Sequence, residues 1–270
     1  MSFWKNLFKQ KQKEQLTPEK VQAYYDEWTD RYIKGFGDTF QSYRTDSLPA
    51  LFDYIMTGAK MKENQRIIDA GFGVGGPSIY FAIQLDIHIH ALTISEYQCQ
   101  IANENIQQAT ALQGKIDVQQ GDFHTLEEYY PAESIDLIYF LESLTHSTDL
   151  SKALESCKKV LKKGGKVYIK DLYYNSATDK KIKKEIEQAV ENVNQGFSLH
   201  VEEISTLKEK IIAAGFKINM CRPLQIPFHA DIANQFVADN EIVIYQDQKG
   251  LYDGKGVTYL AYYETFIEKL

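Results

Sequence analysis

Short apolar runs alternate with amphipathic segments through the middle of the chain. The runs predict buried strands over residues 66–70, 87–94, 116–119, 135–141 and 166–172. Between the last two runs, apolar positions from Leu150 to Leu161 recur on one face of a predicted helix, and Gly164 is expected to end that helix. Strands that alternate with helices of this length predict a mostly parallel sheet with helices on both faces.

We therefore expect an α/β fold with a doubly wound, mostly parallel, seven-stranded Rossmann-like sheet, whose later strands lie near 216 and 258–266. The expected parts are an N-terminal helical cap segment over 1–60, an α/β core over 61–172, a helical lid insertion over 173–203 and, over 204–270, the rest of the core with elements of a substrate pocket. Right-handed crossovers place ligands at the carboxyl edge of parallel strands, so residues just after each strand are candidates for function.

Two amphipathic faces outside the core each leave two interpretations open. The first follows the fifth strand and indicates either a packed insertion or the lid over a pocket. It consists of Ile182, Ile186, Ala189, Val190 and Val193. The second is aromatic and indicates core packing or, in part, one wall of a pocket. It consists of Tyr24, Tyr25, Trp28 and Tyr32.

Composition excludes several classes of function. The 270 residues carry a net charge of −7, which argues against general nucleic-acid binding. No apolar run approaches the roughly 20 residues that cross a bilayer, and no secretory signal is recognised. Cys99, Cys157 and Cys221 lack metal-ligand spacing, and their small number favours a reducing, cytoplasmic location. We expect no metal, and assign no role to His88 and His90, which alternate on the second strand without a partner at ligand spacing.

The first 15 residues combine Phe3, Trp4, Leu7 and Phe8 with lysines. Weak contact with a membrane surface, docking on the domain and disorder all fit this pattern. The sequence also leaves open whether the chain forms a homo-oligomer.

A glycine-rich loop follows the first predicted strand and reads Asp69-Ala-Gly71-Phe-Gly73-Val-Gly75-Gly76-Pro77. Glycines at such a place admit positive φ angles and let a ligand approach the backbone closely. The loop also satisfies the GxGxxG pattern of NAD enzymes, so it is ambiguous alone. An NAD site needs an acid at the end of the second strand to hold the ribose, whereas residues 92–95 there are Leu-Thr-Ile-Ser. The acid before the glycines and the missing second acid favour S-adenosylmethionine as the ligand.

Four motifs, in the correct order, resemble the class I S-adenosylmethionine-dependent methyltransferases. Residues 66–77 look like their first motif. Residues 91–98 resemble the second motif of a subgroup that holds the sterol, tocopherol and geranyl diphosphate C-methyltransferases and the cyclopropane fatty acid synthases. Residues 24–41 are similar to the N-terminal segment of the sterol enzymes, and residues 142–149 look like their Glu-x-x-x-His segment. The resemblance covers about residues 20–172.

The resemblance implies a set of cofactor-binding residues. It places Asp69, Gly71, Gly73 and Gly75 at the methionine end of the cofactor, and Thr93, Ile94 and Gln98 at the ribose and adenine. Further contacts with the adenine or over it are implied for Asp122, Phe123, Leu141, Phe40 and Gln41. Gln98 also has a structural interpretation, because with Ser95 it forms a capping-box pattern at a helix start.

Glu142, His146 and Tyr25 are the candidates for the reacting site. The first two follow the fourth strand, where the substrate should lie. Their structural alternatives are a charge partner for a helix end and a loop histidine. If the acceptor is an alkene, a carboxylate and aromatic faces stabilise the cation that methyl transfer leaves. If it is an oxygen or nitrogen, His146 is the natural base.

The resemblance thus implies an S-adenosylmethionine-dependent methyltransferase that methylates a small, apolar, isoprenoid- or sterol-like molecule at carbon and releases S-adenosylhomocysteine. An O- or N-methyltransferase of a small natural-product metabolite is the alternative. An alternative of another class is a non-catalytic small-molecule binding protein on the same fold. The sequence departs from the sterol enzymes at Leu144-Thr145 and beyond residue 172, which leaves the acceptor open, and we find no basic cluster for a diphosphate.

Overall fold

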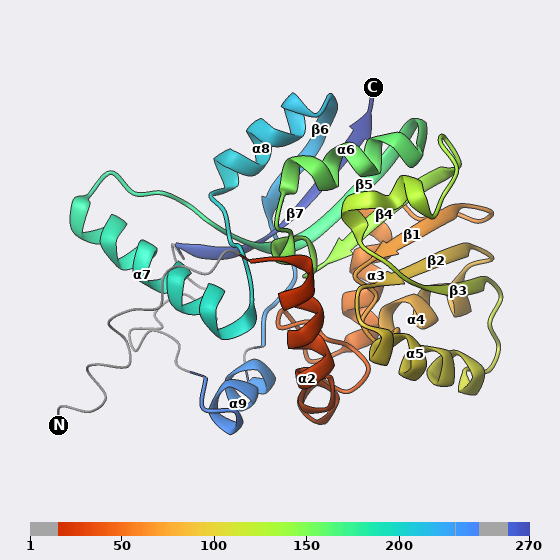
Figure 1. Cartoon of the computed structure of the whole chain (residues 1–270), viewed down its shortest axis with the longest axis horizontal. Coiled ribbons are helices and arrows are strands. Elements are labelled where there is room, and N and C mark those ends of the chain that lie inside the picture. The colour runs from red at the N-terminus through yellow and green to blue at the C-terminus, as the bar shows by residue number, and fades with distance from the viewer. Residues whose placement is uncertain (1–15, 230, 243–258) are drawn as a thin grey trace.

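The computed structural model describes residues 16–229, 231–242 and 259–270, so the interpretations of residues 1–15 lie outside the described part. A seven-stranded sheet runs through the molecule in the order β3-β2-β1-β4-β5-β7-β6 (Figure 1). Its strands are β1 (Arg66–Ala70), β2 (His88–Thr93), β3 (Lys115–Gln120), β4 (Ile135–Leu141), β5 (Leu161–Tyr174), β6 (Phe216–Pro223) and β7 (Leu260–Lys269). Neighbours from β3 to β5 pair in parallel, whereas β7 is antiparallel to both β5 and β6. The predicted α/β class and mostly parallel seven-stranded sheet are confirmed.

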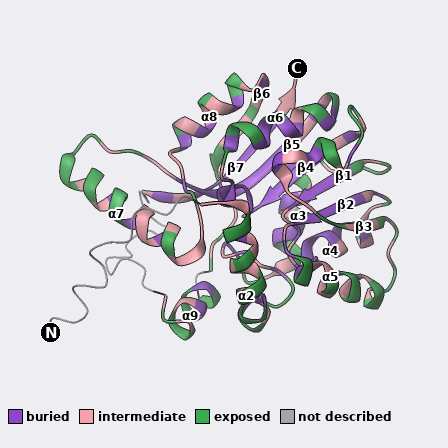
Figure 2. Cartoon of the chain, viewed as in Figure 1, coloured by how far each residue is buried: buried purple, intermediate pink, exposed green. Residues whose placement is uncertain are grey.

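Helices cover both faces of the sheet. They are α2 (Pro18–Phe36), α3 (Leu48–Ala59), α4 (Gly76–Gln84), α5 (Glu96–Gln108), α6 (Leu150–Val160), α7 (Lys180–Phe197), α8 (Ile204–Ala213) and α9 (Asp231–Asp239), with short 3₁₀ helices η1 (Phe123–Glu128) and η2 (Leu144–His146). Because strand side chains alternate between faces, Ile67 packs with α3 and α4, while its neighbour Ile68 packs with α6 and α8. The central strands are therefore buried on both sides (Figure 2). Within the described ranges, no helix combines the length and apolar character needed to cross a membrane.

The aromatic face of α2 packs mainly against α9. The rings of Tyr32 and Phe36 each lie 4.8 Å from the ring of Phe236, measured between centroids. Pro18 occupies the first turn of α2, and the side chain of Thr17 caps it. Core packing thus accounts for most of this face, with Tyr25 as the exception described below.

Helix α7 occupies the predicted insertion. Its apolar face packs through Ala189 and Val193 against Leu172 and Tyr262. Figure 1 shows the helix projecting to one side of the sheet, and most residues of its first half are exposed (Figure 2). The helix agrees with the sequence pattern, whereas its role as a lid stays a prediction.

The predicted end of α6 is wrong, because the helix stops at Val160 rather than near Gly164. Leu161 already has extended backbone angles and pairs with Ile135 at the start of β5. Its side chain is nevertheless fully buried in the same core as the helix. Periodicity alone cannot separate a buried helical position from a buried strand position that follows it.

A buried carboxyl group ties the end of β1 to its neighbours. Asp69 is 3% exposed and accepts hydrogen bonds from the hydroxyls of Ser78 at 2.6 Å and Tyr139 at 3.0 Å. Burial raises the pKa of Asp69 to about 7, and this effect outweighs the two hydrogen bonds, which act to lower the pKa. The side chain therefore joins β1 to α4 and β4 beneath the glycine loop.

We expect Asp69→Asn to change how stability depends on pH. The unfolded carboxyl ionises near its ordinary pKa of 3.8, whereas the folded one holds its proton up to about pH 7. The wild-type protein therefore loses stability as the pH rises from about 4 to about 7, and the asparagine variant lacks this loss. Urea unfolding at several pH values should show the free energy of unfolding of the variant, relative to wild type, rising over this window and levelling off above it.

Asp86→Asn, at an exposed aspartate, is the matched control and should show no such trend. If the difference in free energy of unfolding between Asp69→Asn and wild type is constant from about pH 4 to about pH 7, the raised pKa of Asp69 is contradicted.

Candidate functional site

A cavity lies at the carboxyl ends of β1, β2 and β4, beside α2. Its volume is about 660 Å³ including the open space at its mouth. Tyr25, Glu142 and His146 all line it. Nine of the twelve residues expected at the cofactor also line it: Phe40, Gly71, Gly73, Thr93, Ile94, Gln98, Asp122, Phe123 and Leu141. The structure thus brings most of the predicted site together.

The glycine loop needs glycine for two physical reasons. Gly71 has a φ of 103°, and a Cβ built on it would lie 2.3 Å from the Cβ of Ser143. Gly75 has a φ of 100° and begins α4, where a Cβ would lie 2.6 Å from the ring of Phe72. A side chain at Gly71 would therefore push the loop away from the residues after β4, and one at Gly75 would collide with the loop's own Phe72.

Three residues expected at the cofactor, Asp69, Gly75 and Gln41, are not among the lining residues. Asp69 holds the strand beneath the loop, and Gly75 shapes the turn into α4. Gln41 is 2% exposed, and its Oε1 accepts from the ammonium group of Lys170 at 2.9 Å. Its Nε2 is buried and has no hydrogen-bond partner among the described residues.

Gln98 serves the helix start and the docking of α2 together. Its backbone N–H donates to the side chain of Ser95, which caps α5. Its side-chain Oε1 accepts from Thr93 at 2.6 Å, and its Nε2 donates to Thr29 of α2 at 3.2 Å. The side chain does not reach back to Ser95, so only one half of the capping box forms.

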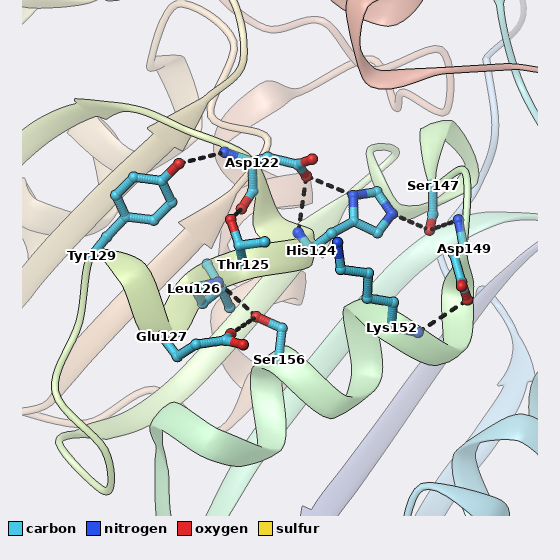
Figure 3. Close-up of polar contacts among 10 residues, drawn as sticks. All are labelled: Asp122, His124, Thr125, Leu126, Glu127, Tyr129, Ser147, Asp149, Lys152 and Ser156. Carbon is cyan, nitrogen blue, oxygen red and sulfur yellow. Dashed lines mark hydrogen bonds and ion pairs between the residues drawn. The ribbon is translucent and has the colours of Figure 1, made fainter.

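A chain of hydrogen bonds fixes the carboxyl group of Asp122 after β3 (Figure 3). Its Oδ1 accepts from the backbone N–H of His124 at 2.9 Å and lies 2.5 Å from the Nδ1 of that ring. The Nε2 of His124 lies 2.8 Å from the hydroxyl of Ser147, which also accepts the backbone N–H of Asp149 at 3.2 Å. A neutral ring with its proton on Nδ1 satisfies every one of these contacts.

These contacts also set the charge of Asp122. Burial alone would raise its pKa, but the hydrogen bonds from His124 outweigh burial and hold the pKa below its ordinary value. Oδ2 receives no hydrogen bond from the described residues. Asp122 therefore presents one ionised oxygen that is free to accept a hydrogen bond from a ligand.

Glu142 meets Lys170 in a buried ion pair. Its carboxylate contacts the Lys170 ammonium group and accepts the backbone N–H groups of Ser42 at 2.6 Å and Tyr43 at 3.1 Å. The side chain of Lys170 is fully buried, and burial lowers its pKa while Glu142 opposes that shift. Both carboxylate oxygens are thus engaged, and the segment before α3 is held against the ends of β4 and β5.

Tyr25 and His146 form a dyad on one side of the cavity. The hydroxyl of Tyr25 lies 2.7 Å from the Nε2 of His146, whose Nδ1 lies 2.9 Å from the carbonyl of Ser198. A carbonyl only accepts, so Nδ1 carries the proton, and the Tyr25 hydroxyl donates to Nε2. Burial lowers the pKa of His146 to about 4 and raises that of Tyr25 well above its ordinary value. Both side chains are therefore uncharged at neutral pH.

Sequence reasoning missed the residues that hold the dyad and the ion pair. Asp171, fully buried with a pKa that burial raises to about 6, accepts the backbone N–H and hydroxyl of Thr145 next to His146. Arg44 is 4% exposed and donates to backbone carbonyls of the segment that carries Gln41. The one signal available was the charged pair Lys170-Asp171 inside a run predicted to be a buried strand.

Comparisons with known proteins match the core of this fold. A family model described as a methyltransferase domain matches residues 68–169. Phosphoethanolamine N-methyltransferase 1 of Arabidopsis thaliana is 30% identical over 141 residues, covering 52% of this chain and 27% of that protein. Sterol 24-C-methyltransferase of Kluyveromyces lactis is 30% identical over 154 residues, covering 54% and 41%. The 27-O-demethylrifamycin SV methyltransferase of Amycolatopsis mediterranei is 26% identical over 163 residues, covering 57% and 59%. The chain thus spans less than two thirds of each of these relatives.

Solved structures match over nearly the whole chain. The cyclase SpnF has a TM-score of 0.74 at 18% identity and covers 94% of this chain and 96% of its own. The cyclopropane synthase MmaA2 from Mycobacterium tuberculosis has a TM-score of 0.71 at 16% identity and covers 96% and 100%. Likeness at these identities establishes the fold. Together with this shared fold, the family model and the relatives indicate a methyltransferase domain over residues 68–169.

Proposed function

We propose that this chain transfers the methyl group of S-adenosylmethionine to a small, apolar molecule and releases S-adenosylhomocysteine. The observation that carries the proposal is a single cavity lined by the glycine loop, the free carboxylate oxygen of Asp122 and the Tyr25–His146 dyad. The relatives named above methylate nitrogen, carbon and oxygen according to their names. The acceptor atom must therefore be argued from the cavity itself.

The cavity offers complementary groups for both ends of the cofactor. Gly71 and Gly73 expose backbone on one wall, where a methionine moiety can approach without meeting a side chain. The exocyclic amine of adenine is a hydrogen-bond donor, and the free Oδ2 of Asp122 is an ionised acceptor for it. Phe123 and Leu141 supply apolar surface for the faces of the ring.

The charges of the cavity favour an uncharged acceptor. Among the described residues, no lysine or arginine lines it, so a diphosphate would meet no cation there. The Glu142 carboxylate is already neutralised by Lys170. On the side of α2, the lining residues Pro18 and Val21 are apolar, and Tyr25 presents an aromatic ring. A neutral, apolar molecule loses least by entering such a site.

For a carbon acceptor, the protein holds the alkene in line with the methyl group and excludes water. The alkene π electrons form the new C–C bond as the bond between the methyl carbon and sulfur breaks, its electron pair staying on sulfur. The acceptor is left as a carbocation, which the face of Tyr25 can stabilise. The electron pair of a neighbouring C–H bond then re-forms the double bond, and a proton is released. The oxygen of Tyr25 takes this proton while its own proton passes to the Nε2 of His146.

The dyad also favours a second candidate, methylation of a hydroxyl or amine. An acceptor O–H or N–H at the Tyr25 oxygen would pass its proton along the same path as the new bond forms. The 2.7 Å contact between Tyr25 and His146 supports this reading as much as the first. Both candidates use the hydroxyl of Tyr25 to pass a proton to His146, and the carbon candidate also needs the face of its ring.

We expect the protein to bind S-adenosylmethionine and S-adenosylhomocysteine and not NAD, because β2 ends without an acid for an NAD ribose. Isothermal titration calorimetry measures each affinity. Release of S-adenosylhomocysteine with a panel of terpenoids, sterols and phenols then identifies the acceptor. Binding of NAD without binding of S-adenosylmethionine would contradict the proposal. Cofactor binding with no turnover across a broad panel would support a non-catalytic binding protein instead.

Variants of Tyr25 separate the two candidates with the best acceptor from that panel. For a carbon acceptor, Tyr25→Phe keeps the ring. Relative to Tyr25→Phe, Tyr25→Leu should lose roughly a further 30-fold in kcat, which corresponds to about 2 kcal/mol of cation–π stabilisation. For an oxygen or nitrogen acceptor, both Tyr25 variants and His146→Gln should each lose a similar factor in kcat, roughly 10²–10⁴-fold. Cofactor dissociation constants, which should stay within a few-fold of wild type, are the control. Wild-type turnover in all three variants would remove the dyad from the mechanism.

A third prediction concerns adenine recognition through Asp122. His124→Gln frees the carboxylate from the ring that orients it, so the dissociation constant for S-adenosylmethionine should rise about 10-fold, the loss of one well-placed hydrogen bond. kcat at saturating cofactor should change little. Discrimination against an analogue with a carbonyl oxygen in place of the adenine amine should fall as well.

Ser156→Ala is the matched control for that variant. Ser156 bonds the same 3₁₀ helix through the backbone N–H of Leu126 and does not touch Asp122 (Figure 3). If it weakens cofactor binding as much as His124→Gln, the effect is one of local stability and Asp122 does not read the adenine.

A further inference from the structure

Three metal-ligating side chains meet on the sheet at a distance from the cavity. His88 and His90 alternate on β2, so their side chains lie on the same face, with ring centroids 4.2 Å apart. His90 pairs with Asp117 of β3 across the parallel ladder. One ligand atom from each residue lies within 4.8 Å of the other two. The sequence could not show this group, because Asp117 comes from the neighbouring strand.

The hydrogen bonds show which ring nitrogen of His90 is available. Its Nε2 lies 3.3 Å from a guanidinium nitrogen of Arg66, which only donates, so this nitrogen is unprotonated. An unprotonated imidazole nitrogen is what a metal ion requires of histidine.

The other two ligands are held together and open to solvent. The Nε2 of His88 lies 2.6 Å from the Oδ2 of Asp117, and their side chains are 30% and 44% exposed. An ion entering here replaces the proton that His88 shares with the carboxylate. The same exposure leaves room for water as a fourth ligand, as in an open zinc site.

Two cationic side chains contact these ligands. Lys115 lies 2.9 Å from the Oδ1 of Asp117, and Arg66 contacts His90 as described. Both are long side chains at the surface, and that of Lys115 is 66% exposed, so each can turn toward water. They compete with a bound ion rather than block it, and their removal should strengthen binding.

We propose that His88, His90 and Asp117 form a binding site for a divalent transition-metal ion of the zinc class. Two imidazoles and one carboxylate suit zinc, whereas magnesium and calcium prefer oxygen ligands throughout. The site is structural in character. None of the three ligands lines the cavity, and His90 comes two residues before Leu92, the first cavity-lining residue of β2, about 7 Å along the strand. A bound ion would link the edge strand β3, which carries Asp117, to β2, which carries both histidines.

Titration of the purified full-length chain with Zn²⁺ alone, after treatment with a chelator, tests the site. Calorimetry should show one ion per chain, and Asp117→Asn and His88→Gln should each weaken its binding by at least about 10-fold. His90→Gln should do the same, and circular dichroism verifies its fold because this residue is buried. Lys115→Gln should strengthen binding by roughly three- to ten-fold, since it removes a competing charge.

His229→Gln, at an exposed histidine elsewhere, is the control and should bind the ion as wild type does. Co²⁺ in place of Zn²⁺ gives a second readout, because its visible absorption reports the ligand set and should fall in the same variants. Absence of binding at millimolar Zn²⁺ overturns the proposal. Binding that survives Asp117→Asn and His88→Gln, or that is lost in His229→Gln, overturns it equally, because the ion is then held elsewhere.

Discussion

Lys170 has no exposure to solvent, and its ammonium group meets the Glu142 carboxylate at the point where β4 ends. Two charges in such a place are costly to desolvate, and the surrounding hydrogen bonds offset that cost. Gln41 accepts from Lys170, while the backbone of Ser42 and Tyr43 donates to Glu142. Removal of either partner would leave the other charge buried and unpaired, and would lower the free energy of unfolding by about 3–5 kcal/mol. The position of the N-terminal segment over the sheet depends on this pair.

The same pair neutralises the charge that Glu142 would otherwise bring to the cavity. Glu142 lines the cavity with a φ of 58°, a backbone conformation that non-glycine residues rarely adopt. This conformation persists because the carboxylate is held from three directions. Both carboxylate oxygens of Glu142 are thus engaged in positioning the walls, which is why the proposed function assigns the proton transfer to Tyr25 and His146.

The sequence predicted those parts of the site that rest on local patterns. Apolar runs located the strands, and the glycines with Asp69 located the cofactor loop. Contacts between distant segments could not be predicted in this way. Nothing near Asp122 indicates that Ser147 anchors it through His124, since the two segments meet only when η1 packs against α6. Asp117 likewise becomes a neighbour of His90 only through the register of β2 and β3.

The place of β7 in the sheet has a consequence for the order of assembly during synthesis. Among the described strands, β6 pairs only with β7, which separates it from β5. While a nascent chain lacks residues 260–269, β5 has an open edge and β6 has no partner, although β1 to β5 can already pair. Open strand edges invite association with other chains. The growing polypeptide is therefore most prone to aggregation after its cofactor loop is in place and before its last strand emerges.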